Sequence, residues 1–462
     1  MRDRLLLCGA ALAAFGASLG SGFHFDDYGI FSDPLLASAD GWKTLGNLAR
    51  ARPLTDLTYW LNSIAGGPVA YHALNLALHL AAVWLAFECL RRVLPERAAL
   101  VAAAIFAVHP LQAEAVNYVS ARGMVLATVL CLAAWLAWLR GQRWTTVACF
   151  AAALLAQPEC AAFPAILALT NRKPRAPLAA MLSLSAAALA RALLVRPQAA
   201  LSPWRYFLAE GVAIWRYLRL LIVPYGFTID PDVPSPAPWI GLLAWAALVG
   251  LAYLAWRRRW RWLLLGLVLL LPSSSVFPAP DLAADSRMYL PLLALSVAAA
   301  LALERAPTSV VLPAAASVVV LLVALSIARC VVWNSDQALW REAVARAPHK
   351  IRAKIQLARA LPAGQALELL AAARRDEPQN PQIAAEIGRV LLSQGQTDAA
   401  LDELSRSLAV NPRDALTLNN RGVALEQLGQ TVAARADFER ALRIDPALTA
   451  ARENLARLNG ER

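Results

Sequence analysis

The sequence predicts an all-α protein in which a polytopic membrane part is followed by a domain of helical repeats. Of its 462 residues, 59% are hydrophobic and only 16% are charged, whereas about a quarter of the residues in soluble domains are charged. Apolar runs recur through residues 1–330, and a 34-residue pattern recurs after them. These observations favour about 11 membrane-spanning helices in residues 1–330 and an α-solenoid in residues 331–462.

Each predicted span is an apolar run that a helix can carry across most of a bilayer, a distance that takes roughly 20 residues. Several runs are shorter than this, so we expect their helices to extend into the flanking loops. The runs are Leu5–Gly20, Tyr71–Leu90, Ala98–Val108, Met124–Leu139, Trp144–Ala156, Cys160–Thr170, Ala176–Val195, Trp239–Trp256, Trp262–Phe277, Met288–Leu303 and Thr308–Ala328.

The loops between these runs predict an orientation. Short loops on one side hold 15 arginine and lysine side chains, and longer loops on the other side hold most of the acids. Cytoplasmic loops collect Arg and Lys, so we expect a cytoplasmic N-terminus and extracytoplasmic repeats. The alternation holds only if Trp204–Val223, an amphipathic stretch with Glu210, Arg216 and Arg219, lies on the membrane surface. Alanine- and arginine-rich usage and the absence of an Asn-X-Ser/Thr sequon favour a bacterial inner membrane.

Charge and cysteine usage exclude two other classes of protein. The net charge of +12 comes from cations grouped in short loops between spans, which is typical of membrane orientation and does not indicate a nucleic-acid partner. The cysteines lie in or beside apolar runs without C-x-x-C spacing, so they predict small buried residues and neither a disulfide framework nor a zinc site. They are Cys8, Cys89, Cys131, Cys149, Cys160 and Cys330.

The C-terminal part repeats with a regular period. Prolines at 348, 378, 412 and 446 lie 30, 34 and 34 residues apart, and residues 381–414 align with 415–448 without gaps. Small residues recur where paired helices approach each other, as Gly388 and Gly422 do, which is the tetratricopeptide pattern. We expect units near 349–380, 381–414 and 415–448. Their stacked helices form a concave face that suits a protein or extended peptide partner.

Two adjacent carboxylates, Asp26 and Asp27, follow the first predicted span. Acids at a bilayer surface are costly to desolvate, so they commonly serve as a base, as metal ligands or as partners of a cation. A solvated pair of loop acids is the alternative for these two residues.

Further polar residues gather in the segments predicted on the same side. His109, Glu114 and Arg122 lie in one short segment after a proline-terminated run, and Asp285 and Arg287 precede the tenth run. Glu114 and Arg122 could form a structural ion pair. Alternatively, Glu114 serves a metal or another cation while Arg122 holds an anion such as a phosphate. Arginine at a helix end also snorkels without further function.

Several of these segments resemble one family. Asp26-Asp27 after the first span, the motifs RPLT, YHALNLALHL, FAVHPLQAEAVNYVSARG, RYLRLLIVP and SRMYLP, and Trp333 at the entry into the repeats are similar to the transmembrane and tetratricopeptide repeat-containing O-mannosyltransferases. The resemblance implies the C-type fold of polyprenyl-phosphate-sugar-dependent glycosyltransferases. It also implies an acidic pair near the acceptor hydroxyl, here Asp26 and Asp27, and basic groups for the lipid phosphate, here Arg122 and Arg287.

From this resemblance we expect a hexosyltransferase that moves a sugar from a polyprenyl-phosphate carrier to a hydroxyl of an extracytoplasmic protein. Mannose is the favoured donor sugar. Asp26 is favoured as general base, and inversion follows from direct displacement. His109, Glu114 and Asp285 would support the site or hold a divalent cation, Mg or Mn. The repeats would bind the acceptor. Transfer to a lipid or glycan, and a non-enzymatic repeat scaffold for envelope assembly, are the alternatives.

Overall fold

The computed structural model describes residues 1–47, 49–170, 175–195, 201–233, 236–274, 281–304 and 306–460. All regular elements in these ranges are helices. The chain folds as two compact units, Met1–Ser335 and Asp336–Arg462, where the sequence-based division was placed after residue 330. The all-α prediction is confirmed, with apolar helices in the first unit and helical repeats in the second.

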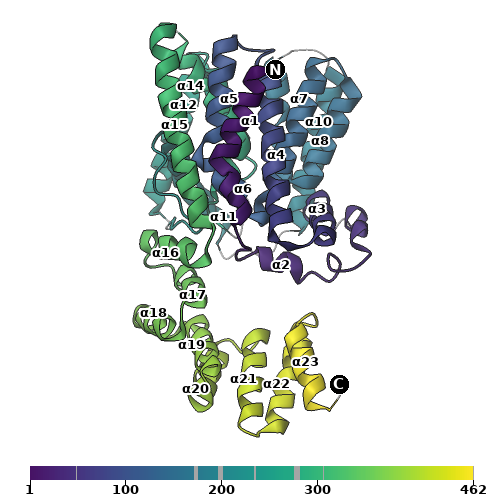
Figure 1. Cartoon of the computed structure of the whole chain (residues 1–462), viewed down its shortest axis with the longest axis vertical. Helices are drawn as coiled ribbons and strands as arrows, with labels where there is room; N and C mark the ends of the chain where they lie inside the picture. Colours follow the sequence, from purple (N-terminus) through teal and green to yellow (C-terminus); the bar gives the residue numbers. More distant parts are fainter. Residues whose placement is uncertain are drawn as a thin grey trace. The chain divides into compact units, whose positions relative to one another are not determined.

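The first unit is a bundle in which α1, α4, α5, α7, α8 and α10 run side by side (Figure 1). Helices α14 and α15 pack beside α5, α13 packs against α14, and α12 packs against α11 and α13. Its α-helices are α1 (Arg2–Phe15), α2 (Asp27–Phe31), α3 (Pro53–Ala65), α4 (Gly67–Leu90), α5 (Glu96–Val108), α6 (Ala113–Asn117), α7 (Arg122–Leu139), α8 (Arg143–Ala156), α9 (Pro164–Thr170), α10 (Arg175–Val195), α11 (Pro203–Ile222), α12 (Pro238–Arg257), α13 (Arg261–Leu270), α14 (Tyr289–Leu303) and α15 (Thr308–Trp333). Short 3-10 helices include η1 (Gly16–Gly20), η4 (Val119–Ala121) and η6 (Asp285–Met288).

Six helices among the described residues are long and apolar enough to cross a membrane, so the predicted count of eleven is not confirmed. They are Arg2–Gly20, Gly67–Leu90, Val119–Leu139, Pro238–Arg257, Asp285–Leu303 and Ser309–Trp333. A seventh candidate combines α5 with Pro110–Asn117 and is bent by 47°, where Pro110 cannot continue the hydrogen-bond ladder of α5. The remaining predicted runs form shorter apolar helices (α8, α9 with the residues before it, α10 and α13), and residues 275–277 of the ninth run lie outside the described residues.

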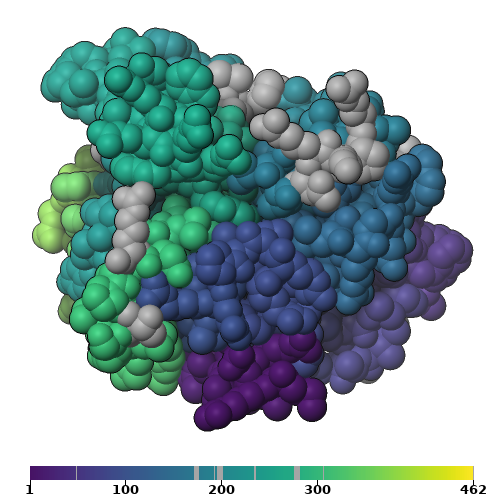
Figure 2. All heavy atoms as spheres, turned by 90° about the horizontal axis from the view of Figure 1, so that it is seen from above, coloured from purple at the N-terminus to yellow at the C-terminus, as the bar shows by residue number. Residues whose placement is uncertain are grey.

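At the end of the bundle where the N-terminus lies, a buried carboxylate connects the start of α1 to the end of α4. Figure 2 shows α1 in purple packed against blue residues of α4 and α5 at this end. Glu88, near the end of α4, accepts from Arg4 at 2.5 Å, Arg91 at 2.9 Å and Arg92 at 2.7 Å. A carboxylate with only 7% of its side chain exposed is stabilised there by three cations. The start of α1 and the end of α4 therefore lie together, as the alternation of the loops requires.

Helix α11, the predicted amphipathic surface helix, is not among the candidate spans. Near both of its ends it contacts loop residues at the end of the bundle opposite the N-terminus, where Figure 1 labels it. These contacts join the Tyr206 hydroxyl to Ser273 O (3.2 Å), the Ala284 N–H to the Tyr217 hydroxyl (2.9 Å) and His109 Nε2 to Leu221 O (3.1 Å). Contacts from both ends of α11 to the same end of the bundle agree with a helix that does not cross.

The second unit stacks helix pairs. It comprises α16 (Asp336–Arg346), α17 (Ile351–Arg359), α18 (Ala363–Asp376), α19 (Pro381–Ser393), α20 (Thr397–Val410), α21 (Ala415–Gln427), α22 (Thr431–Ile444) and α23 (Thr449–Leu458). Gly395 and Gly429 turn the chain within their pairs at φ of 73° and 75°, a conformation that glycine adopts without steric cost. At Gly422 an added Cβ would lie 2.5 Å from a Phe438 ring carbon, so this glycine permits the close approach of α21 and α22.

We expect Gly422→Ala to destabilise the repeats by about 1–3 kcal/mol, because the new methyl group overpacks the contact with the buried Phe438 ring. Gly364→Ala is the matched control: it lies in α18 with no atom within 4 Å of an added Cβ, and it should stabilise by roughly 0.5–1 kcal/mol. Hydrogen exchange in α21 and α22 measures the first change. Equal protection in both variants would contradict the packing argument.

Candidate active site

The acidic pair lies in a turn directly after the first span, which we call the carboxylate turn (residues 23–28). The structure separates the two acids. Asp27 is fully buried, whereas Asp26 is exposed. Between them and the first span, Phe25 has a φ of 38°, a strained conformation for a residue with a large side chain that persists only when its surroundings hold it.

The Asp27 carboxylate accepts hydrogen bonds from the turn and from η4. Its Oδ2 accepts the His24 N–H at 3.0 Å, and its Oδ1 accepts both the N–H and the hydroxyl of Ser120 at 2.8 Å. Ser120 belongs to η4, so Asp27 joins the first loop to the start of α7. Asp27 therefore holds the site together, and Asp26 is the carboxylate that solvent can reach.

Burial raises the pKa of the Asp27 carboxyl from its ordinary 3.8 to about 6, against the hydrogen bonds from His24 and Ser120, which lower it. Because the folded-state pKa exceeds the unfolded value, the folded protein binds more protons between these two pH values. We expect stability to fall by on the order of 2 kcal/mol as pH rises from about 4 to about 6. Thermal melting of wild type and Asp27→Asn over this window checks it, since the variant should lack this component. Identical pH slopes would contradict the assignment to Asp27.

Arg122 lies at the start of α7 and is fully buried. Its Nε donates to Asn75 Oδ1 at 2.6 Å, Nη2 to Tyr71 O at 3.0 Å and Nη1 to Thr58 Oγ1 at 3.2 Å. The guanidinium also stacks over the rings of Tyr59 and Tyr71, 4.8 and 5.3 Å from their centroids. The ion pair between Glu114 and Arg122 is not formed, and Arg122 instead connects α3, α4 and α7.

Glu114 is joined to the segment before the tenth predicted run. Its Oε2 accepts the Asp285 N–H at 3.0 Å and its Oε1 accepts the Ser286 hydroxyl at 2.7 Å. Asp285 in turn pairs with Arg216 of α11 at 2.6 Å. The predicted residues Glu114 and Asp285 thus meet across 171 positions of sequence, and α11 supplies the cation.

Arg287 follows in the same segment and is also buried. It donates to Glu210 Oε1 at 3.2 Å and to the carbonyls of Asp281 at 2.7 Å and Leu282 at 3.1 Å. Glu210 is on α11, so a second ion pair holds this helix to η6. Both predicted phosphate ligands, Arg122 and Arg287, therefore lie at this end of the bundle with several of their donors already in use.

The residues suggested for a divalent cation have protein partners. Nδ1 of His109 accepts the Leu111 N–H at 3.1 Å and its Nε2 lies 3.1 Å from the carbonyl of Leu221, so neither ring nitrogen faces a ligand position. Within the described ranges no group of three or more His, Cys, Asp or Glu side chains could hold a metal ion. His109, Glu114 and Asp285 as placed do not fit a metal centre, and we derive no step through one.

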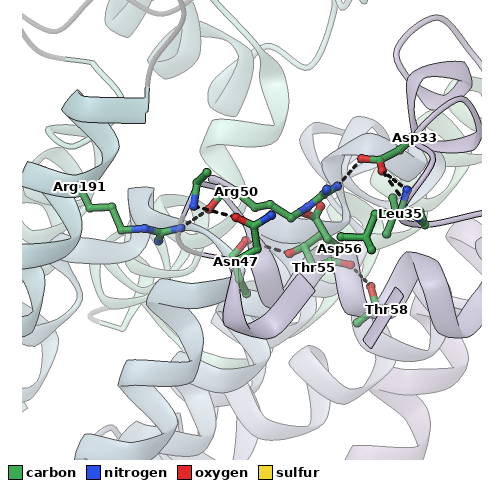
Figure 3. A network of polar contacts seen from close by, with 11 residues as sticks. Asp33, Leu35, Asn47, Arg50, Thr55, Asp56, Thr58 and Arg191 are labelled. Carbon is green, nitrogen blue, oxygen red and sulfur yellow. Dashed lines mark hydrogen bonds and ion pairs between the residues drawn. The ribbon is translucent and has the colours of Figure 1, made fainter. Parts of the chain in front are cut away.

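The first loop contributes a network that the sequence did not reveal. Figure 3 shows Arg50 between Asp33 and Asp56, with Arg191 of α10 donating to its carbonyl. Both carboxylates bind the Arg50 guanidinium, with a distance of 2.6 Å to Asp56 Oδ2, and they raise its pKa. Arg50 therefore links the first loop, through Asp33, to α3, through Asp56.

Arg52, two residues further on, is placed differently. It is partly exposed, and its Nη1 donates to the Ser120 carbonyl at 3.2 Å. Ser120 is the residue that binds Asp27, so Arg52 borders the carboxylate turn without being bound to a carboxylate among the described residues. Arg52 opens the RPLT motif, which was the available sequence signal.

Comparisons with known proteins find similarity over parts of this chain. The tetratricopeptide repeat family model matches residues 363–403 and 385–448. Protein O-mannosyl-transferase Tmtc1 of Drosophila melanogaster is 36% identical over 163 residues, which cover 30% of this chain and 18% of that protein. Human Protein O-mannosyl-transferase TMTC3 is 31% identical over 170 residues, covering 32% of this chain and 19% of that protein. Among solved structures, MamA covers 27% of the chain with a TM-score of 0.24.

This chain therefore matches less than a fifth of the length of these curated relatives. Their names agree with the resemblance carried by the motifs, and the repeat model agrees with the period of the C-terminal part. Over about a third of its length this helical protein is similar to proteins named protein O-mannosyl-transferases, and its C-terminal part matches the tetratricopeptide repeat model.

Proposed function

We propose that this protein is an integral-membrane glycosyltransferase that moves mannose from a polyprenyl-monophosphate carrier to a hydroxyl of an extracytoplasmic protein. The proposal depends on the difference between the two acids of the carboxylate turn. The Asp27 carboxylate is buried and accepts three hydrogen bonds, whereas Asp26 is exposed. The relatives named protein O-mannosyl-transferases support the reaction class.

In the proposed reaction the acceptor hydroxyl gives its proton to the Asp26 carboxylate while its oxygen attacks the anomeric carbon of the sugar. The bond from that carbon to the phosphate oxygen breaks, and the polyprenyl phosphate leaves with the bonding electrons. A single displacement inverts the anomeric centre, because the attacking and leaving oxygens occupy opposite faces. A carboxylate that reaches solvent can meet an incoming hydroxyl, which Asp27 cannot.

Negative charge on the leaving phosphate needs a cation that is still able to bind it. Arg122 and Arg287 were the predicted ligands, and most of their donors bind protein groups. We add Arg52 to this set, since it borders the carboxylate turn and makes one hydrogen bond to a carbonyl. Glu114 and Asp285 would then orient α11 and η6 around the donor, through Arg216.

The repeats would hold the acceptor protein, as stacked tetratricopeptide units bind extended segments. The arginine-rich loops support a cytoplasmic N-terminus and therefore extracytoplasmic repeats. The membrane that we propose is a bacterial inner membrane. A requirement for Mg or Mn remains a prediction, which activity measured in the presence of a chelator would test.

The test uses purified protein in detergent, radiolabelled polyprenyl-phosphate-mannose and a membrane-envelope protein extract. We expect label on protein, and we expect Arg52→Gln to raise the donor KM by roughly 10- to 100-fold, the value of one charge-assisted hydrogen bond. Arg219→Gln is the control, because Arg219 is exposed and, among the described residues, donates only to the Tyr225 carbonyl at 3.0 Å. Label on lipid or glycan would redirect the proposal to that acceptor. No transfer from any polyprenyl-phosphate sugar would favour a repeat scaffold.

A further inference from the structure

We propose that Trp333, in the last turn of α15, is a positioning residue for the carboxylate turn. Its catalytic consequence rests on the proposed function, but its structural consequence does not. The sequence singled out Trp333 only as part of the entry into the repeats. Trp333 lies more than 300 residues after Asp26 in the sequence, yet in the structure it contacts His24 in the same turn as Asp26.

The first contact is with His24. Nε2 of His24 donates to the Trp333 carbonyl at 2.6 Å, and the two rings meet edge to face with centroids 5.6 Å apart. His24 also donates its backbone N–H to Asp27 Oδ2. Trp333 therefore holds the second residue of the turn, His24, which binds the buried Asp27.

The second contact is with Tyr118. The rings of Tyr118 and Trp333 lie 5.5 Å apart between centroids, and the Tyr118 hydroxyl accepts the Asp26 N–H at 3.0 Å. The indole thus packs against His24, the residue before Phe25, and against Tyr118, whose hydroxyl binds the backbone of the residue after Phe25. Phe25 has a φ of 38°, and strained backbone of this kind persists when its surroundings prevent relaxation.

Packing alone accounts for the role of the indole. Trp333 is fully buried, and its Nε1 makes no hydrogen bond within the described part of the chain. Trp333→Phe consequently keeps an aromatic ring against His24 and Tyr118 and loses no hydrogen bond. Trp333→Ala leaves a cavity beside both rings.

The end of α15 is anchored by its next residue as well. The side-chain amide of Asn334 lies 2.9 Å from the Ser21 hydroxyl, in the segment that leads from the first span into the turn. The repeat unit begins at Asp336. Trp333 and Asn334, near the end of the first unit, are therefore both part of the scaffold of the carboxylate turn.

Hydrogen–deuterium exchange of the full-length protein tests the inference without any substrate. We expect the peptide covering residues 22–31 to exchange roughly tenfold faster in Trp333→Ala, and close to wild type in Trp333→Phe, because local opening is governed by local packing. Trp135→Ala is the matched control, since Trp135 is also fully buried, has an unbonded Nε1 and lies in the second half of α7. Equal exchange of residues 22–31 in the Trp333→Ala and Trp135→Ala variants would overturn the inference.

Kinetics provide the second readout. Trp333→Ala should lower kcat by roughly 10- to 100-fold with little change in donor KM, since misplacing a reacting group costs about this much, and Trp333→Phe should restore it. Should Trp333→Ala fail to fold, Trp333→Leu replaces it, because leucine removes the ring contacts with His24 and Tyr118 while filling part of the space. A wild type without transferase activity would overturn the proposed function, and the exchange result would still decide the role of Trp333.

Discussion

Asp26→Asn is expected to lower sugar transfer by roughly 10²- to 10⁴-fold, the usual contribution of a general base. The amide cannot accept the hydroxyl proton, and the substitution leaves the hydrogen bond from the Asp26 N–H to Tyr118 intact, because that bond belongs to the backbone. Asp26 is exposed, so the melting temperature should change little. Turnover of labelled donor by wild type and variant, matched for folded protein, measures the effect.

Asp27→Asn is the informative comparison for this result. An amide nitrogen in place of one oxygen faces the N–H of His24 or the two donors of Ser120 and leaves at least one of them unpaired. We expect a loss of about 1–3 kcal/mol of stability, with activity falling as the turn loosens. Full activity in Asp26→Asn together with lost activity in a stably folded Asp27→Asn would reverse the assignment of the base.

Arg122→Lys is expected to be destabilising, at a cost of about 1–3 kcal/mol for each buried acceptor left without a donor. Lysine has neither the planar fork that reaches Asn75, Thr58 and Tyr71 together nor the flat face that stacks on two tyrosine rings. The buried acceptors on α3 and α4 would then lack donors. The yield of monodisperse protein and its melting temperature report the change.

The same substitution separates two roles for Arg122. If its guanidinium mainly binds the donor phosphate, Arg122→Lys should fold normally and show only a raised donor KM, since lysine also binds phosphate as a point charge. If it mainly connects helices, folding is lost first. Arg219→Lys is the control, because it makes the same arginine-to-lysine change at an exposed position of α11.

Local sequence patterns were sufficient for the parts of this protein that repeat or partition by polarity. The 34-residue period predicted the tetratricopeptide units, because each unit must place small residues such as Gly388 and Gly422 against a neighbouring helix. Apolar runs predicted the helices of the first unit, because the cost of burying backbone and charge in a bilayer is paid residue by residue. The amphipathic pattern of α11 likewise predicted a helix that follows one end of the bundle.

Only the tertiary structure decided what the candidate site residues do. Asp26 and Asp27 are the same residue type side by side, and long-range partners in η4 bury one and leave the other exposed. Glu114 meets Asp285 and Ser286 where the sequence suggested Arg122, and Trp333 lies behind a turn near the start of the chain. The physical reason is that burial and hydrogen bonding depend on which distant segments pack together, whereas a sequence pattern reports only the polarity and spacing of neighbours along the chain.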